Sequence, residues 1–133
     1  MQSALDTTEM TVLSWSVVLL LAQVAAQAFA SYDLGPRYLL GPRDENRPRN
    51  VLAGRLARAL RNLLETYPAF IAVALALVVT EKAGGIAATG AWMWLAGRVC
   101  FVVFYAFGIP VARTVAWMVA LVGLLMMLYR LMV

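Results

Sequence analysis

The chain has 133 residues, of which 63% are hydrophobic and only 14% charged, and its formal net charge is +4. A soluble domain of this size has too little interior to bury so much apolar surface, so the composition excludes an ordinary soluble protein and indicates a membrane protein. The sequence has no histidine and a single cysteine, Cys100, so it lacks the commonest metal ligand and cannot form an intramolecular disulfide. No metal site is predicted, and Cys100 is expected to be a buried, inert thiol because it lies within an apolar run.

Four apolar stretches are long enough to cross a bilayer, which takes roughly 20 residues. They cover about residues 11–31, 63–81, 88–107 and 112–132. The first follows a leader that carries Asp6 and Glu9 and no Lys or Arg, whereas a signal peptide begins with a basic segment. We therefore expect a retained span, although Ala28-Phe29-Ala30 fits a cleavage pattern. The predicted fold is an all-α membrane protein, a four-transmembrane-helix bundle that occupies residues 1–133 as one domain.

The segment 32–61 between the first two spans is strongly basic. It holds three acidic residues and seven arginines, and its balance of +4 equals the net charge of the chain; the arginines are Arg37, Arg43, Arg47, Arg49, Arg55, Arg58 and Arg61. By the positive-inside rule this loop faces the cytoplasm and both termini face the other side. The simplest interpretation is that the arginines fix the topology and touch anionic lipid headgroups. A nucleic-acid partner is not expected, because the loop lacks interleaved aromatic residues.

Within this segment GPRDENRPR should be irregular, and the helical pattern resumes at about Val51. The second helix is therefore expected to begin in the cytoplasm and to continue into the bilayer. Where this helix enters the predicted span, Arg58, Asn62 and Glu65 have the spacing i, i+4 and i+7, which places them on one helix face. Ionisable residues at membrane depth indicate a functional site by default.

The third span carries a second polar face, in which Arg98, Phe101 and Tyr105 have the spacing i, i+3 and i+7. We predict that Arg98 and Glu65 form an ion pair between the two helices, a role that would be structural. One carboxylate cannot neutralise the remaining arginines at this end, among them Arg113 at the start of the fourth span. The surplus positive charge predicts a pocket for an anionic ligand.

These residues resemble a known family. The stretch ARALRNLLETYP contains Arg58-Ala59, Asn62, Glu65 and Pro68, which match the RAxxNxxExxP motif of the MAPEG proteins, the membrane-associated proteins of eicosanoid and glutathione metabolism. Gly97-Arg98-Val99 through Tyr105, followed by GIPVART at 108–114, is similar to the signature of the family's third and fourth helices. Gly41-Pro42-Arg43-Asp44-Glu45 is similar to a loop of bacterial members, which implies a bacterial inner membrane. The resemblance covers about residues 34–131.

The resemblance implies a homotrimer that binds glutathione as co-substrate between adjacent subunits, near the cytoplasmic face. It implies a catalytic Arg113 that stabilises the glutathione thiolate, a structural Arg98 paired with Glu65, and a set of residues that contact glutathione, namely Arg58, Asn62, Glu65, Tyr105 and Arg113. The reaction would be that of a glutathione transferase or peroxidase acting on lipophilic electrophiles from the bilayer.

Three departures from the family leave other functions open. Phe101, Thr66 and Leu60 stand where some members place side chains that hydrogen-bond, so each loses a possible contact to the ligand. The alternative function is a non-enzymatic accessory or scaffold protein with the same fold. A small transporter that uses Glu65 as its coupling carboxylate is less favoured, because the nearby arginines would keep that carboxylate ionised.

Overall fold

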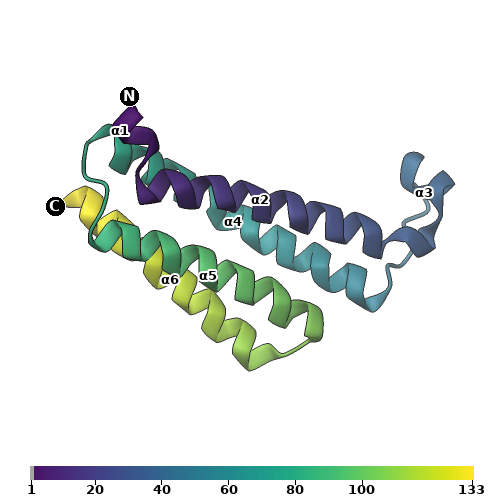
Figure 1. The fold of residues 1–133 in the computed structure, drawn as a ribbon. Coiled ribbons are helices and arrows are strands. Elements are labelled where there is room, and N and C mark those ends of the chain that lie inside the picture. Colours follow the sequence, from purple (N-terminus) through teal and green to yellow (C-terminus); the bar gives the residue numbers. More distant parts are fainter. Residues whose placement is uncertain (1) are drawn as a thin grey trace.

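The computed structural model describes residues 2–133, and all the regular secondary structure in this range is helical. Four long helices form the molecule, and three short ones accompany the first of them (Figure 1). In chain order they are α1 (Gln2–Leu5), α2 (Thr8–Ala30), the 3-10 helix η1 (Tyr32–Leu34), α3 (Pro36–Leu40), α4 (Val51–Val79), α5 (Ile86–Phe107) and α6 (Pro110–Met132).

Four of these segments are long and apolar enough to cross a membrane, namely Thr8–Leu34, Val51–Val79, Ile86–Phe107 and Pro110–Met132. Together they confirm the predicted all-α four-helix fold. α4 begins at Val51, so its first three turns precede the predicted span and carry the arginines toward it. Large apolar side chains stay exposed along all four helices, as lipid-facing surfaces require.

The prediction for Cys100 is wrong, because its side chain is exposed in this chain. The buried face of α5 contains Trp94, Arg98 and Phe101, and position 100 points away from it.

Helix α1, the end of α6 and the α4–α5 turn lie at one end of the bundle, whereas α3 and the α5–α6 turn lie at the other (Figure 1). Two long-range contacts fix the first end. The carboxylate of Glu9, which is fully buried, accepts a hydrogen bond from the Gly84 backbone N–H at 2.7 Å. The Lys82 ammonium donates to the Leu131 carbonyl at 2.8 Å. The turn thereby joins the start of α2 to the end of α6.

The bundle is built from two helix pairs, α2 with α4 and α5 with α6. A Cβ added at Gly90 would lie 2.5 Å from the Gly123 carbonyl oxygen, and one added at Gly97 would lie 2.7 Å from that of Ala116, so α5 and α6 pack backbone to backbone. Across the other pair, the hydroxyls of Ser16 and Tyr67 form a buried hydrogen bond of 2.8 Å.

The core is unevenly distributed along the bundle. The larger cluster joins all four long helices in the half near the termini, and Phe70 of α4 stacks on Trp94 of α5 there with ring centroids 3.8 Å apart. Toward the other end the buried apolar contacts reduce to a small cluster of Ala59, Phe101 and Ala116. The apolar contact between the two helix pairs is therefore extensive near the termini and small near the basic loop.

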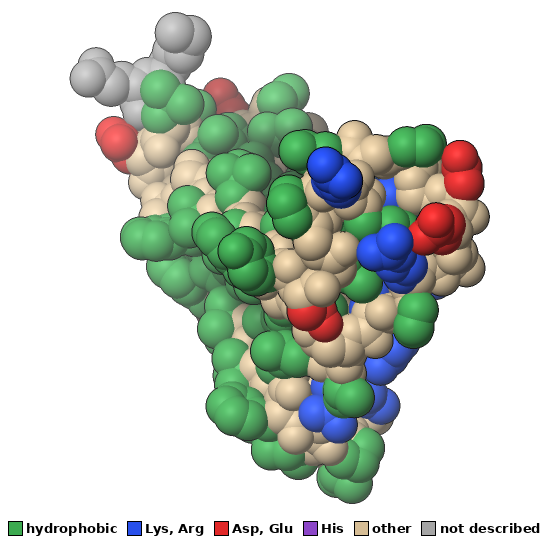
Figure 2. Space-filling view, turned by 90° about the vertical axis from the view of Figure 1, so that its right-hand side faces the viewer, with side chains coloured by type: hydrophobic (Ala, Val, Ile, Leu, Met, Phe, Trp, Pro, Cys, Tyr) green, Lys and Arg blue, Asp and Glu red, His purple; other side chains and the backbone are tan. Residues whose placement is uncertain are grey.

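Side-chain caps order the chain around this loop. Asn50 accepts from the Ala53 N–H at 2.7 Å, which caps α4, and donates to the Ala30 carbonyl at 2.7 Å, which ties α4 to the end of α2. Figure 2 shows this end of the molecule, where Lys and Arg side chains gather on one side and hydrophobic side chains cover the other.

Candidate functional site

A hollow of about 300 Å³ opens between α4, α5 and α6 in the half of the bundle near the basic loop. Its position follows from the uneven core, because the helix pairs have few buried contacts here. The residues that line it come from three helices and are Asn62, Phe101, Tyr105, Arg113, Thr114 and Trp117.

Tyr105 stands between two arginines that come from different helices. Arg58 of α4 donates from Nε to the Tyr105 hydroxyl at 3.3 Å. Arg113 of α6 places its guanidinium carbon 4.5 Å from the centroid of the Tyr105 ring, within the range of a cation–π contact. Because the phenol oxygen accepts from Arg58, its own O–H remains available to donate to a ligand.

A buried arginine holds Asn62 in place. Arg98 is 3% exposed, and its Nη1 donates to the Asn62 side-chain oxygen at 2.7 Å. Its Nη2 donates to the Thr66 hydroxyl, one helical turn further along α4. With its oxygen occupied by Arg98, the Asn62 amide offers its two N–H donors to the hollow.

The predicted ion pair between Arg98 and Glu65 does not form within this chain. The only ion pair in the described residues joins Arg47 to Glu45, and the Glu65 side chain is exposed. The reason is the rotation of α4: Asn62 and Thr66 are the residues turned toward α5, and Glu65 lies about 100° away from Thr66 around the helix.

Aromatic rings provide the other contacts of Arg98. Its guanidinium carbon lies 5.9 Å from the centroid of the Trp94 ring and 5.7 Å from that of Phe101. Phe101 in turn packs edge-on against Tyr105, with centroids 5.5 Å apart. Phe101 therefore links the buried arginine to the tyrosine of the hollow by packing, without a hydrogen bond.

Four of the five predicted ligand contacts thus come together: Asn62, Tyr105 and Arg113 line the hollow, and Arg58 binds Tyr105 at its edge. Glu65 is not brought to the hollow by this chain. Sequence reasoning missed Thr114 and Trp117, although Thr114 directly follows Arg113 and Trp117 lies one turn beyond it.

Arg55 is a further residue that the sequence did not single out. Its Nη1 donates to the Ala106 carbonyl at 3.2 Å, and its guanidinium fills the space that a Cβ at Gly108 would occupy. Gly108 ends α5 in the left-handed conformation with φ 73°, so glycine meets both the steric and the backbone requirement here. Arg55 fixes the α5–α6 turn, which positions Tyr105 and Arg113.

The hollow is positively charged, because Arg113 lines it, Arg58 borders it and no acidic side chain is among its lining residues. Within residues 2–133, no three His, Cys, Asp or Glu side chains lie close enough together to hold a metal ion. The arrangement offers guanidinium, amide and phenol donors, which together suit a ligand with carboxylates and an anionic reacting atom.

The MAPEG family model matches residues 10–133, nearly the whole chain. No curated protein and no solved structure matches the chain significantly. The four apolar helices and the family match identify an integral membrane protein, and the chain belongs to the MAPEG family.

Proposed function

We propose that this membrane protein binds glutathione in the hollow between α4, α5 and α6 and transfers it to lipophilic electrophiles. The observation that carries the proposal is the placement of Tyr105 between Arg58 and Arg113, beside the Asn62 amide. Membership in the MAPEG family, which is associated with glutathione-related metabolism, supports the same ligand.

Glutathione matches the donors of the hollow. It carries two carboxylates, one ammonium and one thiol, so it needs more cationic than anionic partners. Arg58 and the Asn62 amide would bind its carboxylate and peptide oxygens, because guanidinium and amide donors pair with such acceptors. The exposed Glu65 on the same helix would then be the partner for the ammonium. Since Glu65 does not face the hollow of its own chain, we infer that the ligand lies where a second copy, in a homotrimer, completes the site.

We assign the catalytic role to Arg113, which lines the hollow beside the ring of Tyr105. The thiol loses its proton to water, and a nearby cation favours the resulting thiolate, which is the nucleophile. The thiolate sulfur then bonds to the electrophilic carbon, and the leaving group departs with its electron pair. We further assign to the Tyr105 O–H, which the Arg58 contact leaves free to donate, a hydrogen bond to the thiolate sulfur before the attack.

Glutathione titration tests the proposal. The purified protein in lipid nanodiscs should release or absorb heat on binding millimolar glutathione, and ultraviolet absorbance should report the bound thiolate. Arg58→Ala should weaken binding by about tenfold to a hundredfold, the equivalent of a lost charged hydrogen bond. Arg61→Ala, an exposed arginine on the same helix, is the matched control and should bind as the unchanged protein does.

Arg113→Ala separates binding from chemistry. It should leave the affinity for glutathione within a few fold and abolish both the thiolate absorbance and the conjugation of an aryl halide. Absence of binding at millimolar glutathione would refute the proposal. Binding without conjugation of any electrophile would instead favour the alternative, an accessory protein with the same fold.

A further inference from the structure

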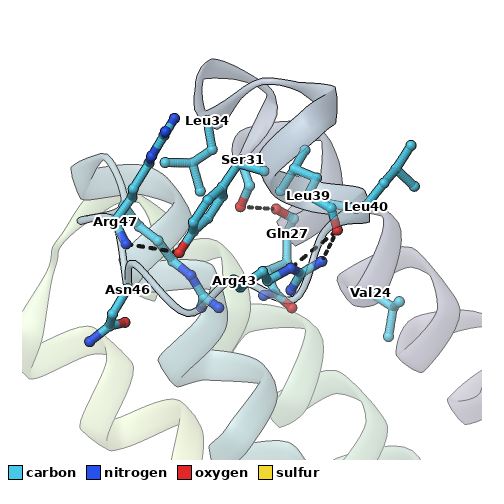
Figure 3. Close-up of a pocket in the computed structure, with 12 residues that line it drawn as sticks. Val24, Gln27, Ser31, Leu34, Leu39, Leu40, Arg43, Asn46 and Arg47 are labelled. Carbon is cyan, nitrogen blue, oxygen red and sulfur yellow. Dashed lines mark hydrogen bonds between the residues drawn. The ribbon is translucent and has the colours of Figure 1, made fainter.

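A second hollow, separate from the first, lies at the same end of the bundle. Its volume is about 480 Å³, and it is enclosed by the last turns of α2, by η1 and α3, and by the loop that follows them. In Figure 3, Val24 and Gln27 approach from α2, whereas Arg43 and Arg47 approach from the loop. None of its lining residues lines the first hollow.

The polar wall of this hollow is cationic. Arg43, Arg47 and Arg49 line it, and no acidic side chain does. The carboxylate of Glu45, which lies outside the hollow, pairs with Arg47 at 3.0 Å. Arg49 has no hydrogen bond or ion pair with any described residue, so at least two guanidinium charges remain without a counter-ion here.

Two of the donors are held in fixed positions. Arg43 donates from Nε and Nη2 to the Leu39 carbonyl at 3.2 and 2.7 Å, which anchors its guanidinium and leaves Nη1 unused (Figure 3). The Tyr38 hydroxyl accepts from the Arg47 backbone N–H at 2.8 Å, so its own hydrogen is available to another acceptor. An anion entering the hollow would meet donors that need little ordering.

The opposite wall carries apolar side chains from the membrane-spanning α2 and from the end of α3. Val24 is 46% exposed on α2, and Leu40 at the end of α3 is 89% exposed. The hollow therefore lies where α2 leaves the apolar region, with guanidiniums on one side and aliphatic side chains on the other. An anion that also carries alkyl chains can contact both the guanidiniums and the aliphatic side chains, whereas a free anion can contact only the guanidiniums.

We propose that this hollow binds the headgroup of one anionic phospholipid, with its phosphate against Arg43, Arg49 and the Tyr38 hydroxyl and its acyl chains along Val24 and Leu40. The positive-inside rule assigns this end to the cytoplasm, whose leaflet carries anionic lipids. The proposal is a discrete site for one headgroup, which differs from the diffuse attraction that any basic loop exerts. It is independent of the glutathione site.

Native mass spectrometry of the purified full-length protein tests the site by counting the lipids retained per chain. The probes are phosphatidylglycerol, zwitterionic phosphatidylcholine and inorganic phosphate. Phosphatidylglycerol should be retained as one saturable copy per chain, and phosphatidylcholine should be retained at least about tenfold less, because its choline repels the guanidiniums. Inorganic phosphate should bind weakly or not at all, since it gains nothing from the apolar wall.

Matched variants separate a site from a charged surface. Arg43→Gln with Arg49→Gln should lower the affinity for phosphatidylglycerol by about tenfold or more, whereas Arg37→Gln with Arg61→Gln removes the same charge outside the hollow and should change it less than about threefold. Leu40→Asn should weaken the binding of phosphatidylglycerol and leave the binding of inorganic phosphate unchanged. Equal loss in the two double variants would overturn the proposal in favour of diffuse attraction. Inorganic phosphate that binds as tightly as phosphatidylglycerol would assign the site to a soluble anion, and no retained lipid would remove the site.

Discussion

Replacing Thr66 by valine tests which residue of α4 holds the buried guanidinium of Arg98. The substitution keeps the shape of the side chain and removes the hydroxyl that accepts from Nη2. Arg98 is 3% exposed and its Nε already has no partner, so the Nη2 donor would also lose its hydrogen bond in the interior. A hydrogen bond to a charged group contributes about 1.5–3 kcal/mol, and we expect Thr66→Val to lower the free energy of unfolding by that amount.

Glu65→Gln supplies the contrasting measurement. The Glu65 side chain is exposed and makes no ion pair in this chain, so its neutralisation should change the free energy of unfolding by no more than about 0.5 kcal/mol. Thr89→Val is the control for the chemical change, because Thr89 is exposed on α5 and bonds only to its own helix, at the Gly85 carbonyl. It too should stay within about 0.5 kcal/mol.

Reversible unfolding in mixed micelles, followed by tryptophan fluorescence, measures all three variants. A loss in Glu65→Gln as large as that in Thr66→Val would refute the reasoning, because it would show that Glu65 and Arg98 pair in the assembled protein. Equal losses in Thr66→Val and Thr89→Val would show instead that the hydroxyl of Thr66 contributes nothing particular.

Three further sets of substitutions test the packing by the same unfolding measurement. Gly90→Ala should destabilise the protein by about 1–3 kcal/mol, because its Cβ would lie 2.5 Å from a carbonyl oxygen of α6. Gly54→Ala should stabilise it by up to about 1 kcal/mol, because the nearest atom to its Cβ is a side-chain nitrogen of Arg58 at 3.4 Å. Equal effects of the two variants would contradict the backbone contact. Tyr67→Phe should lower the free energy of unfolding by about 0.5–1.5 kcal/mol, and adding Ser16→Ala should lower it little further, because the two hydroxyls share one hydrogen bond. Additive losses would show that the two hydroxyls act independently. Glu9→Gln should be at least as stable as the unchanged protein, since Oε2 of the buried carboxylate lacks a partner. Glu9→Ala should lower the free energy of unfolding by about 1–3 kcal/mol, because the Gly84 N–H loses its acceptor. Similar losses in both variants would show that the charge itself is needed.

The sequence predicted the helices well because the bilayer restricts what a long apolar stretch can form. The start of α4 was also predictable, since Asn50 is a strong capping residue and the prolines before it cannot continue a helix. The spacing of Arg58 and Asn62 predicts that they share a helix face. In the structure Arg58 bonds to Tyr105, and Asn62 lines the same hollow.

Contacts that depend on helix rotation could not be read in the same way. Glu65 and Thr66 flank the face centred on Asn62, and opposite charge favoured Glu65 as the partner of Arg98, whereas within this chain Arg98 bonds to Asn62 and Thr66. In the sequence Glu9 is one acidic residue of the leader, and nothing local shows that the α4–α5 turn folds back over it. Such contacts require the tertiary arrangement.

The uneven core has a consequence for how the surrounding bilayer acts on the protein. Arg58 and Asn62 belong to the α2–α4 pair, whereas Tyr105 and Arg113 belong to the α5–α6 pair. The apolar packing between the two pairs lies mainly near the termini, and near the basic loop polar contacts join them. Helices tilt when the thickness of the hydrocarbon layer changes, and a tilt of one pair against the other moves these two sets of donors apart. We expect the affinity for glutathione, the proposed ligand, to peak in nanodiscs of one acyl-chain length and to fall in thinner and thicker ones. An affinity that is constant across chain lengths would show that the two pairs move as one body.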